Sequence, residues 1–193
     1  MSRRRQRELR RIQQRLERYY GLEHAPSVTR FVREGDQGSR EVVLVRETND
    51  ELELALVLPP ESRQIPEGGA LSDVWLQVVE GVSHFIYLAE RARMRLPVTQ
   101  LELELQAEVD KFVLSLELNT DSARAVLERM FDRPRFLDEA GTEAGERYRL
   151  AHHLAARFAA RVIVENDSAR AQATLRSFYR AGQTEKIRLA RAA

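Results

Sequence analysis

The sequence contains no cysteine, which excludes disulfide bonds, thiolate zinc sites, iron–sulfur clusters and a cysteine nucleophile. It has one Trp, six Pro and nine Gly, and the glycines form neither a dinucleotide-binding fingerprint nor a phosphate-binding loop. No apolar run approaches the roughly 18 residues of a membrane-spanning helix. The first residues lack the apolar stretch of a secretory signal. We therefore expect a cytoplasmic protein.

The chain has 193 residues, 43% hydrophobic and 32% charged, which is typical of a folded domain. Its net charge of +1 conceals a strong segregation. Residues 1–20 and 144–193 are both strongly basic, whereas residues 21–143 are strongly acidic. Of its cations, only Lys111 and Lys186 are lysines. The basic ends can bind either the acidic middle of the chain or a partner.

The N-terminal segment, Arg3 to Tyr20, has the pattern of a helix that ends at Gly21. Its apolar residues form a narrow seam, which is wide enough for one neighbour only. We therefore predict that residues 1–20 form a basic helical arm outside a single domain of residues 21–193. The arm is expected to bind a partner protein or a second copy. The predicted contact residues are Arg4, Arg7, Leu9, Arg11, Ile12, Leu16 and Tyr19.

Residues 27–58 are rich in β-forming residues and predict a three-stranded antiparallel meander. The expected strands are 28–34, 40–48 and 51–58, with a tight turn at Asn49-Asp50. In the last strand, leucines at 52, 54, 56 and 58 alternate with other residues, which predicts one inward apolar face. Pro59-Pro60 ends this strand.

Residues 71–193 predict about five helices packed on the sheet, so the expected fold class is α+β. The segments are 72–95, 99–118, 122–131, 143–164 and 168–181, with a short helix after Thr184. Leu101 to Leu105 alternate with Glu like a strand, and a strand there is an alternative. On a helical wheel, residues 101–118 show two opposite apolar stripes, which predict a helix with neighbours on both sides.

The first candidate for chemistry is the pair Glu80 and His84, with Tyr87 nearby. At a spacing of four on a helix their side chains are neighbours, so the carboxylate can orient the imidazole or share a metal with it. The alternative is a solvated polar helix face.

A second candidate is Glu104 and Glu108, whose like charges at i, i+4 favour an intervening cation such as Lys111 or a metal. His152 flanks the apolar stripe of the 143–164 helix. The alternatives are an internal ion-pair seam and a structural histidine. Helical di-iron sites use Glu-x-x-His, which the chain lacks. A single-metal site of His84, Glu108 and His152 is the weakest hypothesis.

Because the chain lacks catalytic motifs, we expect a non-enzymatic interaction protein or subunit of a complex, without a cofactor. One alternative is a small metal- or acid/base-dependent enzyme. Its candidate residues are Glu80, His84, Tyr87, Glu108 and His152. The other alternative is binding of nucleic-acid phosphates by the Arg-rich ends, against which the acidic middle argues.

Overall fold

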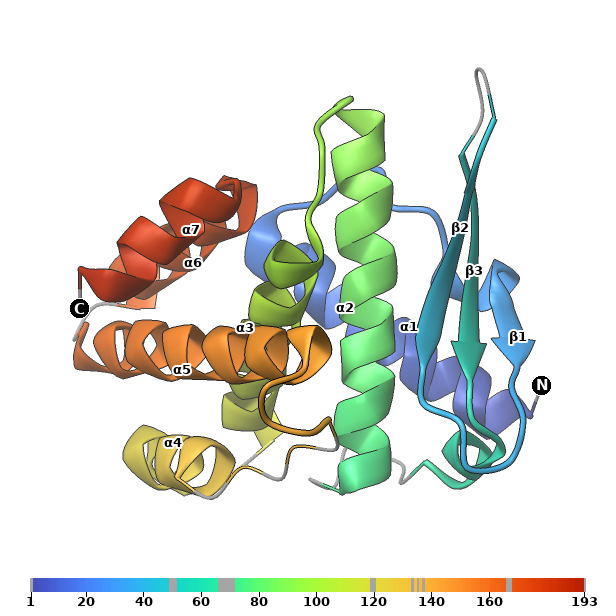
Figure 1. Cartoon of the computed structure of the whole chain (residues 1–193), viewed down its shortest axis with the longest axis horizontal. Coiled ribbons are helices and arrows are strands. Elements are labelled where there is room, and N and C mark those ends of the chain that lie inside the picture. Colours follow the sequence, from blue (N-terminus) through green and yellow to red (C-terminus); the bar gives the residue numbers. More distant parts are fainter. Residues whose placement is uncertain are drawn as a thin grey trace. The chain divides into compact units, whose positions relative to one another are not determined.

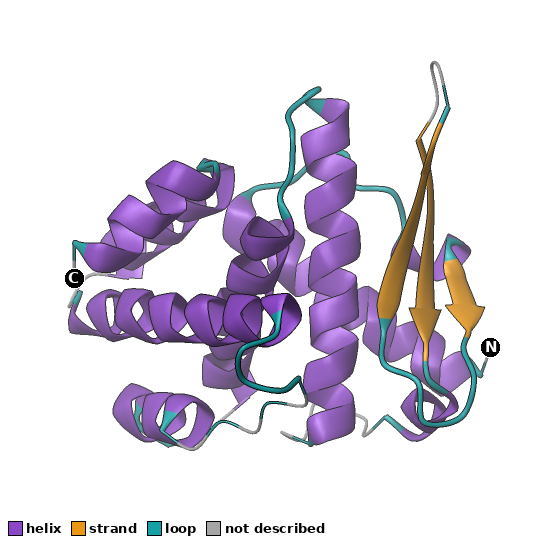
Figure 2. Cartoon of the chain, in the orientation of Figure 1, coloured by secondary structure: helices purple, strands orange, loops and turns teal. Residues whose placement is uncertain are grey.

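The computed structural model describes residues 2–48, 52–65, 72–118, 121–132, 134, 136, 138–165 and 168–192. Over these residues the chain is α+β, as predicted, with seven α-helices and a three-stranded sheet (Figure 2). The predicted turn at Asn49-Asp50 lies outside them. The chain divides into two compact units, one of Met1–Arg18 with Leu22–Pro97 and one of Tyr19–Gly21 with Val98–Ala193. The division into an arm and one domain stays a prediction.

The first helix, α1, spans Arg3–Tyr20, as predicted (Figure 1). Leu9, Ile12 and Leu16 are at most 1% exposed. Gln13 anchors the helix to the chain that follows it, because its side chain accepts from Val28 N at 2.8 Å and donates to Pro26 O at 3.0 Å. The apolar seam of α1 is therefore already covered within the chain.

The sheet consists of β1 (Val32–Glu34), β2 (Val42–Glu47) and β3 (Leu52–Leu58) in the order β1-β3-β2. β2 and β3 are antiparallel, but β1 pairs with β3 in parallel. The predicted antiparallel meander is therefore wrong in this detail. β3 is inserted between β1 and β2. The loop of residues 35–41 permits this order because it is long enough to span the roughly 10 Å of two strand spacings. Residues 28–30, which were expected to start the first strand, form a 3₁₀ turn (η1, Val28–Arg30).

The helix α2 (Asp73–Arg93) covers one face of this sheet. Ser72 caps it, accepting from Trp75 N at 3.2 Å. Gly81 permits the close approach, since a Cβ there would lie 2.9 Å from Leu56 Cδ1. Leu56 and Leu58 on this face are fully buried, whereas Leu54 is half-buried and Leu52 is exposed, so the predicted inward face is confirmed only in the second half of the strand. A second 3₁₀ turn, η2 (Pro60–Gln64), follows β3.

The second unit contains α3 (Gln100–Leu118), α4 (Ala123–Phe131), α5 (Glu143–Val164), α6 (Ser168–Arg180) and α7 (Gln183–Arg191). Because 101–105 belong to α3, the strand alternative is wrong there. Residues of both predicted stripes, such as Leu105 and Leu114, are fully buried. None of the helices in the described part of the chain is long and apolar enough to cross a membrane.

Candidate functional site

Most basic residues of α1 lie around its buried seam, although Arg5 is itself buried. Arg4, Arg7 and Arg11 are exposed, and Arg11 donates to Glu8 at 2.7 Å. Tyr19 is half-buried. Since Leu9, Ile12 and Leu16 are buried inside the chain, only the arginine face of this helix offers a surface to a partner.

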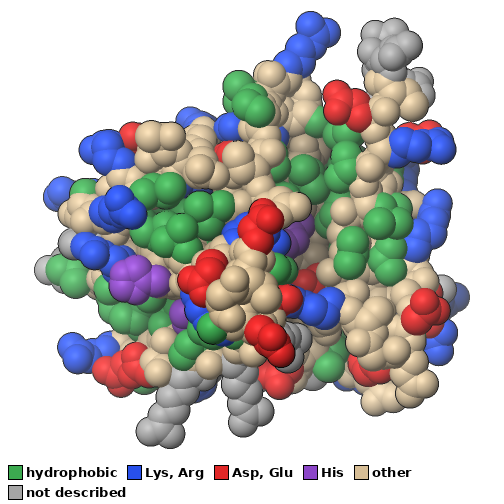
Figure 3. Space-filling view, viewed as in Figure 1, with side chains coloured by type: hydrophobic (Ala, Val, Ile, Leu, Met, Phe, Trp, Pro, Cys, Tyr) green, Lys and Arg blue, Asp and Glu red, His purple; other side chains and the backbone are tan. Residues whose placement is uncertain are grey.

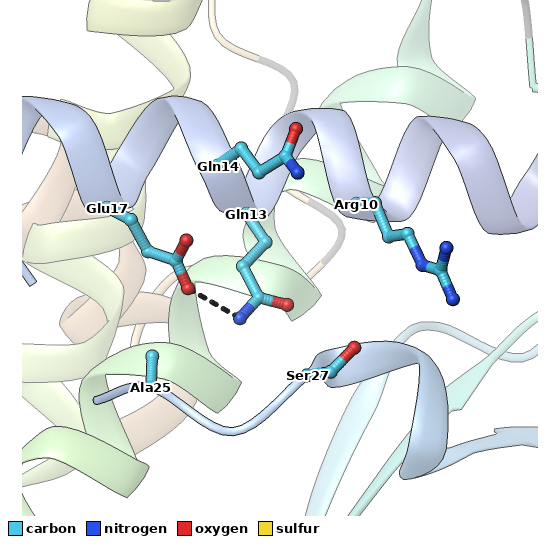
Figure 4. A pocket seen from close by; sticks show the side chains of 6 residues that line it. All are labelled: Arg10, Gln13, Gln14, Glu17, Ala25 and Ser27. Carbon is cyan, nitrogen blue, oxygen red and sulfur yellow. Dashed lines mark hydrogen bonds between the residues drawn. The ribbon is translucent and has the colours of Figure 1, made fainter. Parts of the chain in front are cut away.

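A shallow hollow of about 340 Å³ lies between α1 and the segment that follows it (Figure 4). Most of the residues that line it are polar, and Gln13 at its centre donates to Glu17 at 2.7 Å (Figure 4). The amide of Gln13 is fully used by Glu17, Pro26 and Val28. The hollow is therefore a by-product of this anchor, and we assign it no ligand.

The edge strand β2 exposes apolar side chains to solvent. β2 lies at an edge, and Val42, Leu44 and Val45 are 47%, 54% and 50% exposed. Register places Val42 and Leu44 on the face opposite α2, and Val45 on the α2 face beside β3. Figure 3 shows hydrophobic side chains at the surface of this hairpin, and Figure 1 shows β2 and β3 continuing past the short β1. The hairpin thus exposes apolar side chains on both of its faces.

Glu80, His84 and Tyr87 lie on α2 in the first unit. Glu80 is only 7% exposed and Tyr87 is fully buried, so this face of the helix is not solvated. Glu80 and His84 each offer a ligand atom within 4.8 Å of the other. The predicted proximity of this pair is therefore present in the geometry.

Glu41, just before β2, is a buried neighbour of Glu80 that sequence reasoning missed. Its side chain fills the space left by Gly81, where an added Cβ would lie 3.3 Å from Glu41 Cβ and Cγ. Nη2 of Arg40 lies 3.8 Å from Glu41 Oε1 and 3.4 Å from Glu80 Oε1. Burial and the charge of Glu80 raise the pKa of Glu41 to about 8. The available signal was strand alternation, since Glu41 has the parity of the inward Val43.

Glu108 and His152 meet in the second unit. His152 Nδ1 lies 3.0 Å from Glu108 Oε2, and Lys111 donates to Glu108 Oε1. His152 Nε2 faces Phe131 O at 3.4 Å, so both ring nitrogens are engaged. The rings of Phe131 and Phe136 flank the imidazole with centroids at 4.9 and 5.4 Å. This is the arrangement of an ion-pair seam, and it leaves His152 poorly suited to proton transfer.

The ion pairs of Glu108 make the free energy of unfolding depend on pH in the acidic range. Burial disfavours charge on Glu108, but Lys111 and His152 outweigh it and lower the pKa of this carboxyl to about 2. An unfolded Glu titrates near 4.3, so the stabilisation is present above about pH 4.3 and is lost as the pH falls toward 2. We expect Glu108→Gln to cost about 2 kcal/mol at pH 7 and almost nothing near pH 2. Urea unfolding of both proteins between pH 2 and 7 measures this; a pH-independent difference would contradict it.

Four buried polar side chains in the second unit form a hydrogen-bonded network. Tyr20 donates to Asp110. Gln106 donates to Asp110 at 2.8 Å and to Tyr20 at 3.2 Å, and accepts from Lys186 at 2.5 Å. Lys186 is fully buried and lies 4.2 Å from the centre of the Phe178 ring. Burial, followed by the charge of Asp110, raises the pKa of Tyr20 well above its usual value.

These features define an α+β protein with an exposed hairpin, one acidic–imidazole cluster beside its sheet and a buried polar network among its helices. No model of a known protein family matches the chain, and no curated protein or solved structure shows significant similarity to it. Its function therefore has to be argued from these features alone.

Proposed function

We propose that the protein is a non-enzymatic interaction protein and that its first partner is a second copy, bound through the open edge of β2. The supporting observation is the exposure of Val42, Leu44 and Val45 on an edge strand. Natural edge strands are usually protected by Lys, Pro, bulges or covering segments. β2 contains neither Lys nor Pro, and about half of each of these side chains faces solvent.

A second copy fits this edge chemically. In an antiparallel pair around a two-fold axis centred on Leu44, Leu44 faces its own counterpart and Val43 faces Val45 of the other copy. Val42 then faces the stem of Arg46, whose charge is already paired with Glu53 at 2.6 Å. In the same register Glu47 faces Glu41 of the other copy, so one pair of carboxyl groups is opposed at each end of the paired segment. Pairing would satisfy the open backbone groups and cover the apolar side chains in one step.

The arginine face of α1 remains the second surface of this proposal. Its exposed guanidinium groups suit an acidic partner. Salt separates the two modes, because β-edge pairing rests on apolar contact and backbone hydrogen bonds, whereas docking of Arg4, Arg7 and Arg11 weakens steeply with ionic strength. A cytoplasmic location belongs to the same proposal.

The test is sedimentation velocity of the full chain with Val45→Lys. We expect the wild type to dimerise with a dissociation constant in the micromolar range. This constant should change little between about 0.1 and about 0.5 M NaCl. Val45→Lys removes apolar burial and places a charge in the interface twice, once per copy. It should weaken dimerisation about 30-fold or more.

The matched control is Leu52→Lys. Leu52 is 38% exposed on the same face, but it belongs to the central strand and leaves the β2 edge intact. It should weaken dimerisation much less, and neither variant should change the melting temperature by more than a few degrees. Edge pairing is refuted if the wild type is monomeric at a test concentration of about 100 µM, or if the two variants lose the same amount of dimer affinity.

A further inference from the structure

One face of α1 in the first unit consists almost entirely of arginine. At about 100° per residue, an arc of about 140° around the helix holds Gln14 and every arginine of α1 except Arg5. Within α1, all of which is described, no apolar side chain and no carboxylate belongs to this arc. This arc is the arginine face of α1. Its arginines are Arg3, Arg4, Arg7, Arg10, Arg11, Arg15 and Arg18.

The two acidic residues of α1 lie at the borders of the arginine face, and both are engaged. Glu8 is 1% exposed and accepts from Arg11 at 2.7 Å. Glu17 accepts from Gln13 at 2.7 Å. Every arginine of the face except Arg15 is exposed. Because two carboxylates cannot balance this many guanidinium groups, the helix presents a concentrated positive charge to solvent.

The N-terminal end of the helix adds to this charge. α1 begins with Arg3, Arg4 and Arg5 and has no acidic residue in its first turn, although cations are disfavoured at the positive end of a helix dipole. Arg5 is 2% exposed, and its Nε and Nη2 have no hydrogen-bond partner among the described residues. Burial lowers the pKa of Arg5, and the charge of Glu34 offsets this only in part. A bound polyanion would stabilise this cluster of cations.

The composition of the arginine face favours nucleic acid over other acidic partners. Membrane-bound helices insert an apolar face into the lipid, but Leu9, Ile12 and Leu16 are buried within the chain. Interfaces between proteins are built around an apolar and aromatic core, which an arc of arginine and Gln14 does not supply. Contacts to phosphates need charge and hydrogen-bond donors, and guanidinium groups provide both.

The length of the face also matches a nucleic-acid backbone. Arg3 to Arg18 covers about 22 Å along the helix axis. The same length of duplex carries about six phosphates on each strand. A helix that lies along one strand can therefore bring several guanidinium groups to successive phosphates.

We propose that the arginine face of α1 binds the phosphate backbone of a nucleic-acid duplex without sequence preference. The proposal rests on the second surface described above, whose acidic partner it names, and it does not depend on pairing at β2. The acidic residues 21–143 oppose such binding only where they lie near the contact, because salt screens charges beyond about 10 Å. The local charge of α1 therefore decides.

The experiment is fluorescence anisotropy of a labelled DNA duplex of about 20 base pairs, titrated with the full chain. We expect a dissociation constant in the micromolar range at about 50 mM NaCl. The logarithm of the association constant should fall with the logarithm of the salt concentration with a slope of about −3 or steeper. Two duplexes of unrelated sequence should bind equally, because phosphate contacts carry no sequence information.

The decisive variant combines Arg3→Gln, Arg4→Gln and Arg10→Gln. Arg11 stays in place because it pairs with the buried Glu8. We expect binding to weaken about 30-fold or more and the salt slope to become shallower by about one for each guanidinium that contacts a phosphate. Gln is a good helix former, and the variant removes cations from the positive end of the dipole, so its melting temperature should not fall.

The matched control combines Arg170→Gln, Arg180→Gln and Arg191→Gln, which removes the same charge from exposed positions of the second unit. It should bind DNA within about threefold of the wild type. The proposal is overturned by an absence of binding at about 100 µM protein, by a flat salt response, or by equal losses in the two triple variants. It is also overturned if polyglutamate or phosphatidylserine vesicles bind as tightly as DNA at equal negative charge. Sedimentation of the Arg3/Arg4/Arg10 variant should still show the dimer, so the two proposals fail separately.

Discussion

Replacing Gln106 by Leu is expected to lower the free energy of unfolding by about 4 kcal/mol, the largest effect of any substitution considered for this chain. Gln106 is fully buried, and its amide joins Lys186, Asp110 and Tyr20. Leu has a similar volume but supplies no polar atom. The substitution therefore weakens the hydrogen bonding of a buried ammonium and a buried carboxylate at the same time.

A double-mutant cycle with Lys186→Met shows whether this cost comes from the charge. Met keeps most of the apolar stem of Lys186 against Phe178 while removing the ammonium group. Once the ammonium group is absent, loss of the Gln106 oxygen should matter less. We expect the double variant to be about 1–2 kcal/mol more stable than the sum of the single variants predicts. Urea unfolding followed by circular dichroism measures all four proteins; strict additivity would contradict coupling through Gln106.

The second large effect is expected at Gly145, where substitution by Ala should destabilise the fold by about 3 kcal/mol. A Cβ at this position would lie 2.0 Å from the backbone oxygen of Glu139. The loop before α5 cannot move away cheaply, because Thr142 Oγ1 donates to Glu139 O at 2.8 Å and Gly141 N donates to Glu146 at 2.9 Å. Thr142 caps α5 by accepting from Gly145 N at 3.0 Å, so we expect the clash to disrupt this cap.

Ala144→Gly is the control for this prediction because it makes the reverse change one residue away. Intrinsic helix propensity favours Ala over Gly by about 1 kcal/mol, so propensity alone predicts that Gly145→Ala stabilises and Ala144→Gly destabilises. We expect both to destabilise, Gly145→Ala the more strongly. Thermal and urea unfolding decide between the two accounts, and a more stable Gly145→Ala variant would show that the loop accommodates the methyl group.

Much of the local structure was predictable because its causes are local. Helix periodicity and terminal residues such as Ser72 and Gly21 act within a few residues of the chain, and α1 has its predicted bounds of Arg3–Tyr20. Gly21 has the positive φ of 66° that a helix-terminating glycine commonly adopts. The segment 101–105 was ambiguous because Leu-Glu alternation is compatible with a strand and with two helical stripes. The long apolar pattern beyond residue 105 decides for the helix.

The candidate site was predictable only in part. Glu80 and His84 were found because their spacing of four is a helical neighbour relation. Glu41 was missed because it lies about forty residues before Glu80 in the sequence, and packing of the β2 edge against α2 at Gly81 brings the two together. The same holds for Lys186 and Gln106, which are far apart in sequence and joined by a 2.5 Å hydrogen bond.

The sequence by itself determined the fold class, the helices and the neighbour relation of Glu80 and His84 on one helix face, since periodicity and capping are short-range effects. Only the tertiary structure decided that β1 lies parallel to β3, because strand order depends on which edge is covered and not on strand composition. It likewise decided that the seam of α1 is buried while β2 is exposed. Both segments carry apolar residues, and which of them finds a partner within the chain is a matter of packing between distant segments.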